Sequence, residues 1–146
     1  MITEIVLRRM LYVGTGLIFV VALMLASIVI PSARVDTTPG ATPDSAIPAM
    51  WVLVIIHLLF VAALMKVIFD NQRKGIRIPK GLLVGAGVVL LLLGLVLSDG
   101  ASAYLKHGPG MHTASISMFV CIGCDFLAAV TAFLAAFFKP GKMAGK

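Results

Sequence analysis

Two ionisable side chains, His57 and Asp125, lie within long apolar stretches of the sequence. A carboxylate near the middle of a membrane-spanning helix costs several kcal/mol unless it is paired, neutralised or in contact with water. Such a residue usually serves function or assembly; the simpler alternative is a protonated carboxyl group that donates one hydrogen bond to a neighbouring helix. For His57 the alternatives are a neutral imidazole bonded across the bundle and a role as a ligand or relay.

The depths of these two residues predict that they meet. At about 1.5 Å per residue, His57 lies about 12 Å inward from Ala49, and Asp125 lies roughly 16 Å inward from Ala114. Each residue alone is unfavourable in hydrocarbon, so we predict a hydrogen bond between them, either neutral or ionic. We expect a structural clamp first and a proton relay second, because apolar residues follow both positions toward the inner face.

Cys121 and Cys124 form a Cys-Ile-Gly-Cys sequence, which has the spacing found in thiol oxidoreductases. Its place in a fourth hydrophobic segment resembles the vitamin K epoxide reductase family, and the resemblance covers this motif alone. It implies a redox pair, but members of that family carry a second cysteine pair after the first helix, whereas residues 31–48 contain no cysteine. Packing by two small apolar side chains is the alternative to a redox role.

Three histidines are the candidate ligands for a haem, a metal or a pigment, namely His57, His107 and His112. Membrane bundles hold b-type haem between two histidines of matching depth, so His57 and His112 would require the fourth helix to begin deeper than its apolar run indicates. His57 alone offers the single axial nitrogen that a chlorophyll needs. The sequence lacks nucleotide-binding, zinc-protease and serine-hydrolase motifs, so it assigns no catalytic residue and no metal, and a haem, a quinone or a pigment is compatible with it.

The elements that must position these residues are four long apolar segments. Of the 146 residues, 60% are hydrophobic and 12% are charged, unlike a soluble domain. A helix needs about 20 apolar residues to cross a hydrocarbon core of roughly 30 Å. The apolar runs are continuous rather than alternating, which excludes a β-barrel. We therefore predict an all-α integral membrane protein with one domain over residues 1–146 and helices at about 11–30, 49–69, 82–98 and 114–138.

The basic residues predict the orientation of these helices. Most of them precede the first segment, lie between the second and third, or follow the fourth, and only Arg34 and Lys106 lie in the other two connections. By the positive-inside rule, both termini and the middle loop are cytoplasmic, in an up-down-up-down bundle of a bacterial-type inner membrane. The formal net charge of +6 is thus a signal of topology and not of nucleic-acid binding.

Connections and packing faces are also predicted. We expect an irregular loop from Pro31 to Pro48, and Tyr104 at the outer headgroup level beyond the third helix. Small residues recur at heptad spacing in the third and fourth segments, so these two helices should pack closely. The small residues are Gly87, Gly94 and Ala101 in the third segment and Ala114, Ser117, Cys121, Cys124, Ala128, Thr131 and Ala135 in the fourth.

The function predicted from these features is that of a non-catalytic accessory subunit of a larger membrane complex. The loops are small, polar side chains are few, and each candidate site lacks one or two residues of a working set. The partners are then the lipid bilayer and other membrane subunits or further copies of the chain. The alternatives are a redox, haem-binding or pigment-binding protein that uses His57, Asp125 and the cysteine pair, and a small transporter or proton relay. Whether the protein is an enzyme stays open, with the balance against it.

The predicted orientation can be tested with introduced cysteines. A cysteine at Thr42 or Gly108 should react with a membrane-impermeant reagent added to intact cells, because both positions face outward, whereas one at Gly75 should not. Labelling of Gly75→Cys in sealed cells would reverse the orientation.

Overall fold

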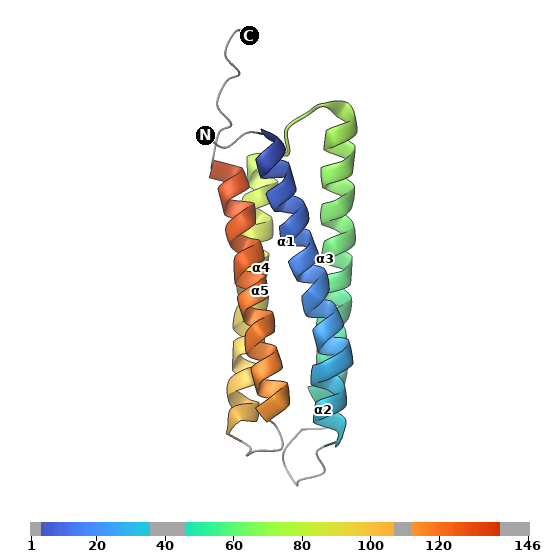
Figure 1. The fold of residues 1–146 in the computed structure, drawn as a ribbon, viewed down its shortest axis with the longest axis vertical. Helices are drawn as coiled ribbons and strands as arrows, with labels where there is room; N and C mark the ends of the chain where they lie inside the picture. The colour runs from blue at the N-terminus through green and yellow to red at the C-terminus, as the bar shows by residue number, and fades with distance from the viewer. Residues whose placement is uncertain (1–3, 36–45, 107–111, 138–146) are drawn as a thin grey trace.

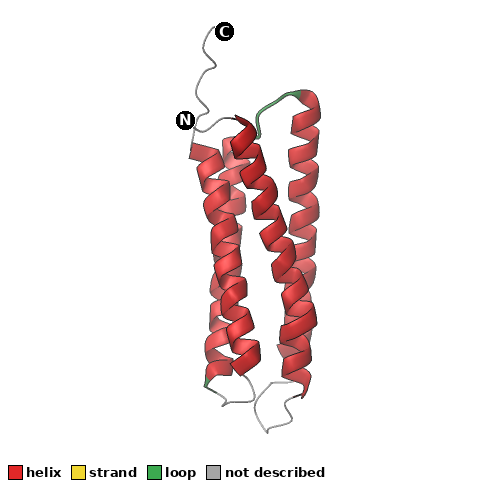
Figure 2. Cartoon of the chain, in the orientation of Figure 1, coloured by secondary structure: helices red, strands yellow, loops and turns green. Residues whose placement is uncertain are grey.

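Helices make up all the regular secondary structure in the computed structural model, which describes residues 4–35, 46–106 and 112–137. The first long helix joins α1 (Glu4–Met24), a π-helical turn η1 (Leu25–Val29) and α2 (Ile30–Val35). It is followed by α3 (Ala46–Lys74), α4 (Lys80–Leu105) and α5 (His112–Phe137) (Figures 1 and 2). Four helices are thus long and apolar enough to cross a membrane, which makes the chain a multi-pass integral membrane protein.

These helices extend past the apolar runs that predicted them. The first candidate span covers Ile5–Arg34 rather than 11–30, and the second covers Ala46–Lys74 rather than 49–69. The third and fourth cover Lys80–Leu105 and His112–Phe137. Hydropathy marks only the part of a helix that lies in hydrocarbon, whereas backbone hydrogen bonding continues into the polar interface.

Pro31 lies inside the first helix, and the prediction that a loop begins there was wrong. Proline lacks a backbone N–H, and its ring conflicts with the carbonyl group four residues earlier. The π-helical turn comes directly before it, where the Ile30 N–H donates to the Leu25 carbonyl oxygen, five residues back instead of four. A π-helical turn is one of the ways in which a helix absorbs such a disturbance, and the helix here continues to Val35.

The helices are not equally close neighbours. α4 and α5 form the most extensive pair, and α1 packs against both α5 and α3. α3 therefore joins the rest of the bundle mainly through α1 and through long side chains. Figure 1 shows α3 standing apart from α4, although a short connection joins them.

Three apolar clusters fill the interior along its length. One joins Leu11 near the start of α1, Ile68 near the end of α3 and Leu83 near the start of α4, with Ala135 of α5 beside them. We call this the α3–α4 end of the bundle. The opposite end is held by a larger cluster that includes Val29, Met50, Ala101 and Ala114, and a smaller cluster around Ile18 and Leu90 lies between the two.

Glycines of α4 receive aromatic rings of α5. A Cβ atom at Gly87 would lie 2.7 Å from Cζ of Phe133, and one at Gly94 would lie 2.8 Å from Cε1 of Phe126. The rings thus rest directly on the α4 backbone, and the predicted close packing of these two helices is confirmed. The predicted small-residue face of α5 is buried at Ala114, Ser117, Cys121 and Ala128 and half-buried at Cys124, Thr131 and Ala135.

Tyr104 does not lie beyond the third helix as expected. α4 continues to Leu105, so Tyr104 falls in its last turn and is buried at 5% exposure. Its hydroxyl group lies 3.9 Å from Sδ of Met50 on α3. Residues 1–3, 36–45, 107–111 and 138–146, and the predictions made for them, lie outside the described residues.

The fit of Gly87 against Phe133 can be tested against a glycine two residues away. Gly85→Ala places its Cβ in open space and gains helix propensity, so it should leave thermal stability in detergent unchanged or raised. Gly87→Ala must displace the ring and should be less stable than Gly85→Ala by roughly 1–3 kcal/mol. Equal melting temperatures for the two variants would contradict close packing of α4 on α5.

Candidate functional site: a buried histidine–aspartate pair

Helical periodicity places His57 and Asp125 on inward-facing surfaces. On α3 the buried positions are Met50, Val54, His57 and Ile68, which follow the spacing of a single helix face. On α5 Asp125 continues the buried face that includes Cys121 and Ala128. Both side chains are buried at 0% exposure.

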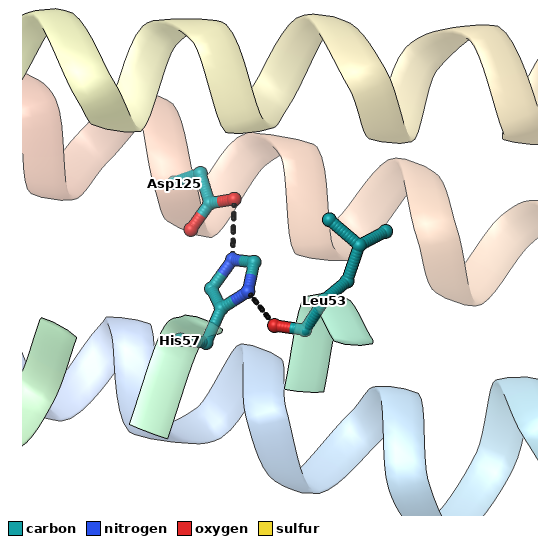
Figure 3. Close-up of polar contacts among 3 residues, drawn as sticks. All are labelled: Leu53, His57 and Asp125. Carbon is teal, nitrogen blue, oxygen red and sulfur yellow. Dashed lines mark hydrogen bonds and ion pairs between the residues drawn. The ribbon is translucent and has the colours of Figure 1, made fainter. Parts of the chain in front are cut away.

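The two side chains form a direct hydrogen bond, as predicted. The distance from Nε2 of His57 to Oδ2 of Asp125 is 3.0 Å. The other ring nitrogen, Nδ1, lies 2.7 Å from the carbonyl oxygen of Leu53, one turn earlier on the same helix (Figure 3). The imidazole is therefore held at both nitrogens, and its orientation is fixed.

These two contacts determine how many protons the pair carries. A carbonyl oxygen can only accept, so Nδ1 of His57 carries a hydrogen and donates it to Leu53. The contact between Nε2 and Oδ2 then holds one proton, which belongs either to an imidazolium or to a carboxylic acid. The pair has no net charge in either form, which removes the largest cost of placing ionisable groups in hydrocarbon.

The hydrogen bond joins two helices that are otherwise weakly connected. α3 and α5 both pack against α1, but neither has the other as a main backbone neighbour. The His57 and Asp125 side chains therefore reach across the interior and fasten α3 to α5 near the middle of the bundle. This geometry supports the clamp that the sequence predicted.

The second carboxyl oxygen of Asp125 does not take part in the bond to His57. Oδ1 of Asp125 is buried and has no hydrogen-bond partner within the described part of the chain. Figure 3 shows it on the side of the carboxyl group away from Leu53. A buried acceptor without a partner is unusual and marks a place where a water molecule, a proton or a ligand group would be stabilised.

A small cavity lies about one turn further along α5. Its volume is about 10 Å³, close to the minimum for one water molecule, and Thr15, Thr131 and Ala128 are among its lining residues. Thr15 donates to the Leu11 carbonyl group and Thr131 to that of Ala128, so each hydroxyl oxygen can still accept a hydrogen bond. The interior between Asp125 and the α3–α4 end is thus less uniformly apolar than the sequence indicated.

The two cysteines are free thiols with different exposure. Cys121 is buried in the larger apolar cluster, and Cys124 is partly buried against the same cluster. Reactive thiols of this spacing usually lie at the exposed start of a helix, whereas Cys121 lies more than two turns into α5. The surroundings of both residues favour packing, while their role as a redox pair stays a hypothesis.

The two candidate histidine ligands that the structure describes, His57 and His112, are not brought together. His112 is the first residue of α5 and is exposed, thirteen residues before Asp125, or about 20 Å along the axis. Because His57 is bonded to Asp125, His112 and His57 lie too far apart to bind the same haem iron. His107 lies outside the described residues. Among the residues that the structure describes, no three His, Cys, Asp or Glu side chains are grouped to hold a metal ion.

Comparisons with protein-family models, curated proteins and solved structures gave no match for this chain. Its function must therefore be inferred from the geometry of the chain itself.

The His57–Asp125 pair was predictable from the sequence, but the second hydrogen bond of His57 was not predicted. The contact with the Leu53 carbonyl group could have been anticipated, since it lies four residues before His57, in the position where a helical side chain bonds back to its own backbone. Away from the pair, at the α3–α4 end, the bond from the Tyr12 hydroxyl to Oε1 of Gln72, at 2.9 Å, had no signal in the sequence because it joins residues sixty positions apart.

A double-mutant cycle tests the pair as a clamp. His57→Phe leaves the carboxyl group without a partner, and Asp125→Leu leaves the imidazole nitrogen without one, so each change should cost roughly 1–3 kcal/mol. The double variant replaces both groups by apolar side chains and should lose clearly less than the sum of the single losses. The measurement is unfolding in detergent. Strict additivity would show that the two side chains do not stabilise the fold together.

Proposed function

We propose that this chain is a non-catalytic accessory subunit of a larger assembly in a bacterial-type inner membrane. In this proposal it is an up-down-up-down bundle with cytoplasmic termini, and α3 is the helix that faces its partners. The observation that carries the proposal is the unusual exposure of α3. In the most apolar stretch of each helix, 17% of the residues of α3 are buried, against 39–44% for the other three helices.

The proposed topology is supported by charge and by packing. The described residues at the α3–α4 end include Arg8, Arg73 and Arg77, which the positive-inside rule places in the cytoplasm. The cluster around Leu11, Ile68 and Leu83 is consistent with neighbouring helices that alternate in direction.

The outward face of α3 is a broad band of exposed residues. Residues along one line of this band recur at intervals of three and four, as positions on one side of a helix do. We call this set the α3 stripe, and it consists of Val52, Ile55, Leu59, Ala62, Lys66 and Phe69. Lys66 is a cation within a membrane-spanning helix, and such residues commonly pair with a partner or reach toward the interface.

Site-specific photo-cross-linking tests this proposal with a matched pair of leucines. Leu59 on the α3 stripe is 65% exposed and Leu92 on α4 is 56% exposed, and both belong to the apolar surface of the bundle. A photoreactive phenylalanine analogue at Leu59 should give an adduct of higher mass in native membranes, while one at Leu92 should react with lipid. Mass spectrometry then separates another subunit from a second copy of the chain. Equal reaction at both positions, or none at Leu59, would contradict a partner on α3.

A second candidate function is proton transfer through the buried pair. The specific observation in its favour is Oδ1 of Asp125, an unsatisfied acceptor within the described residues, directed away from Leu53. A proton that arrives there can pass through the carboxyl group to Nε2 of His57. The apolar residues between the pair and either surface argue for the clamp as the main role.

Asp125→Asn separates the clamp from the relay. The amide can still donate a hydrogen bond to Nε2 of His57, so the clamp should largely survive, but it cannot carry a proton. If the relay operates, wild-type protein in vesicles with an enclosed pH-sensitive dye should conduct protons above the level of empty vesicles. Asp125→Asn should then return this rate to background while its melting temperature stays near that of the wild type. Equal proton flux in the two proteins would contradict proton transfer through Asp125.

A further inference from the structure

A second and larger cavity opens at the α3–α4 end of the bundle. Its volume is about 60 Å³, and residues of all four long helices and of the α3–α4 connection line it. Four of its lining residues are polar or charged, namely Arg8, Asn71, Gln72 and Arg77. None of these residues belongs to the histidine–aspartate pair, and the proposed function uses Arg8 and Arg77 only as signals of orientation.

The backbone at the end of α3 places two of these residues at the cavity. Gly75 has a φ of 64°, in the left-handed region that favours glycine. The Gly75 N–H donates to the Gln72 carbonyl oxygen at 3.2 Å, and the Ile76 N–H donates to that of Asn71 at 3.0 Å. This pair of bonds is the Schellman motif that ends a helix and reverses the chain. Arg77 is thereby brought back beside Asn71 at the cavity.

The mouth of the cavity presents hydrogen-bond donors. Two guanidinium groups line it, from Arg8 on α1 and Arg77 in the connection. Gln72 accepts the Tyr12 hydroxyl through Oε1, so its NH₂ group is a further donor. The amide group of Asn71 is held by donation to the Val67 carbonyl oxygen.

The surrounding charge also favours an anion. In addition to Arg8 and Arg77, the described residues at this end include Arg9, Arg73, Lys74 and Lys80, and the only acidic residues there are Glu4 and Asp70. Phosphate is bound well by paired guanidinium groups, because their donors form short charge-assisted bonds.

The floor of the cavity is apolar. Leu11, Ile68 and Leu83 line it, and the same three residues also line the smaller cavity deeper in the bundle. Both cavities lie on the side where α3 and α4 share a connection but are not main packing neighbours. A ligand suited to this site has an anionic group at the mouth and an apolar part that extends between α3 and α4.

We propose that this cavity binds the phosphate group of an anionic phospholipid, with the start of an acyl chain along the apolar floor. Basic pockets between transmembrane helices bind anionic headgroups in this way. A free anion would use the mouth but gain nothing from Leu11, Ile68 and Leu83. The site requires only that the helices span a membrane, so it is independent of the accessory role and of the relay.

Lipid binding to the purified protein tests the site. The protein is prepared in an uncharged detergent, and binding of phosphatidylglycerol and of phosphatidylcholine with identical chains is measured by native mass spectrometry and by thermal unfolding. Two arginines at the membrane surface should favour phosphatidylglycerol by about thirtyfold. Bound phosphatidylglycerol should raise the melting temperature, and phosphatidylcholine should do so far less. Equal affinity for the two lipids would overturn the proposal.

Three matched variants locate the binding site. Arg8→Gln and Arg77→Gln should each weaken phosphatidylglycerol binding by about fivefold. Arg9→Gln makes the same change of charge at an exposed neighbour that does not line the cavity, so it should have little effect. If Arg9→Gln weakens binding as much as Arg8→Gln, the preference is due to surface charge in general and the cavity is not the site.

Inorganic phosphate and a short-chain lipid separate the headgroup from the acyl chain. Phosphate alone should not reproduce the rise in melting temperature, and phosphatidylglycerol with six-carbon chains should bind more weakly than the long-chain lipid. If phosphate stabilises the protein as much as phosphatidylglycerol does, the ligand is a soluble anion and the lipid proposal is wrong. Failure of the cross-linking experiment on α3 would leave this result unaffected.

Discussion

Hydrocarbon offers no hydrogen-bond partners, so each polar group within the membrane-spanning part must find one inside the protein. The backbone meets this requirement by forming helices. Several side chains meet it locally, since Thr15, Ser27 and Asn71 each donate to the carbonyl group four residues earlier. His57 cannot be satisfied locally at both nitrogens, and its remaining nitrogen therefore reaches another helix. The hydrogen bond from α3 to α5 is a consequence of this single unmet need.

Two kinds of contact hold the bundle together. α4 and α5 join through shape, because glycines of one helix admit aromatic rings of the other and bring the backbones close. Such an interface is tight along its length and tolerates few additional atoms. α3 instead joins through apolar side chains and a few polar contacts made by Met50, His57 and Gln72, so most of its surface is left for lipid or another protein. The difference makes α3 the helix that a partner could contact with the least disturbance of the fold.

The sequence was sufficient where the controlling physics is local or periodic. Hydropathy identified the four spans, small-residue spacing identified the α4–α5 interface, and similar depth identified the His57–Asp125 pair. It failed where a result depends on a helix boundary, as for Pro31 and Tyr104, because hydropathy does not mark where backbone hydrogen bonding ends. From the sequence, Arg8 and Arg77 were interpreted only as signals of orientation. Their common cavity depends on how the chain reverses at Gly75, and composition does not reveal this.

The neutrality of the histidine–aspartate pair has an electrical consequence. A voltage across a membrane does work on net charge, about 2.3 kcal/mol for one charge moved through 100 mV. The pair carries none, and shifting its shared proton between Nε2 and Oδ2 moves charge only within one hydrogen bond. The link between α3 and α5 is therefore almost insensitive to the membrane potential while that proton is kept. Gain or loss of the proton would place a full charge inside the membrane and make the same residues sensitive to voltage.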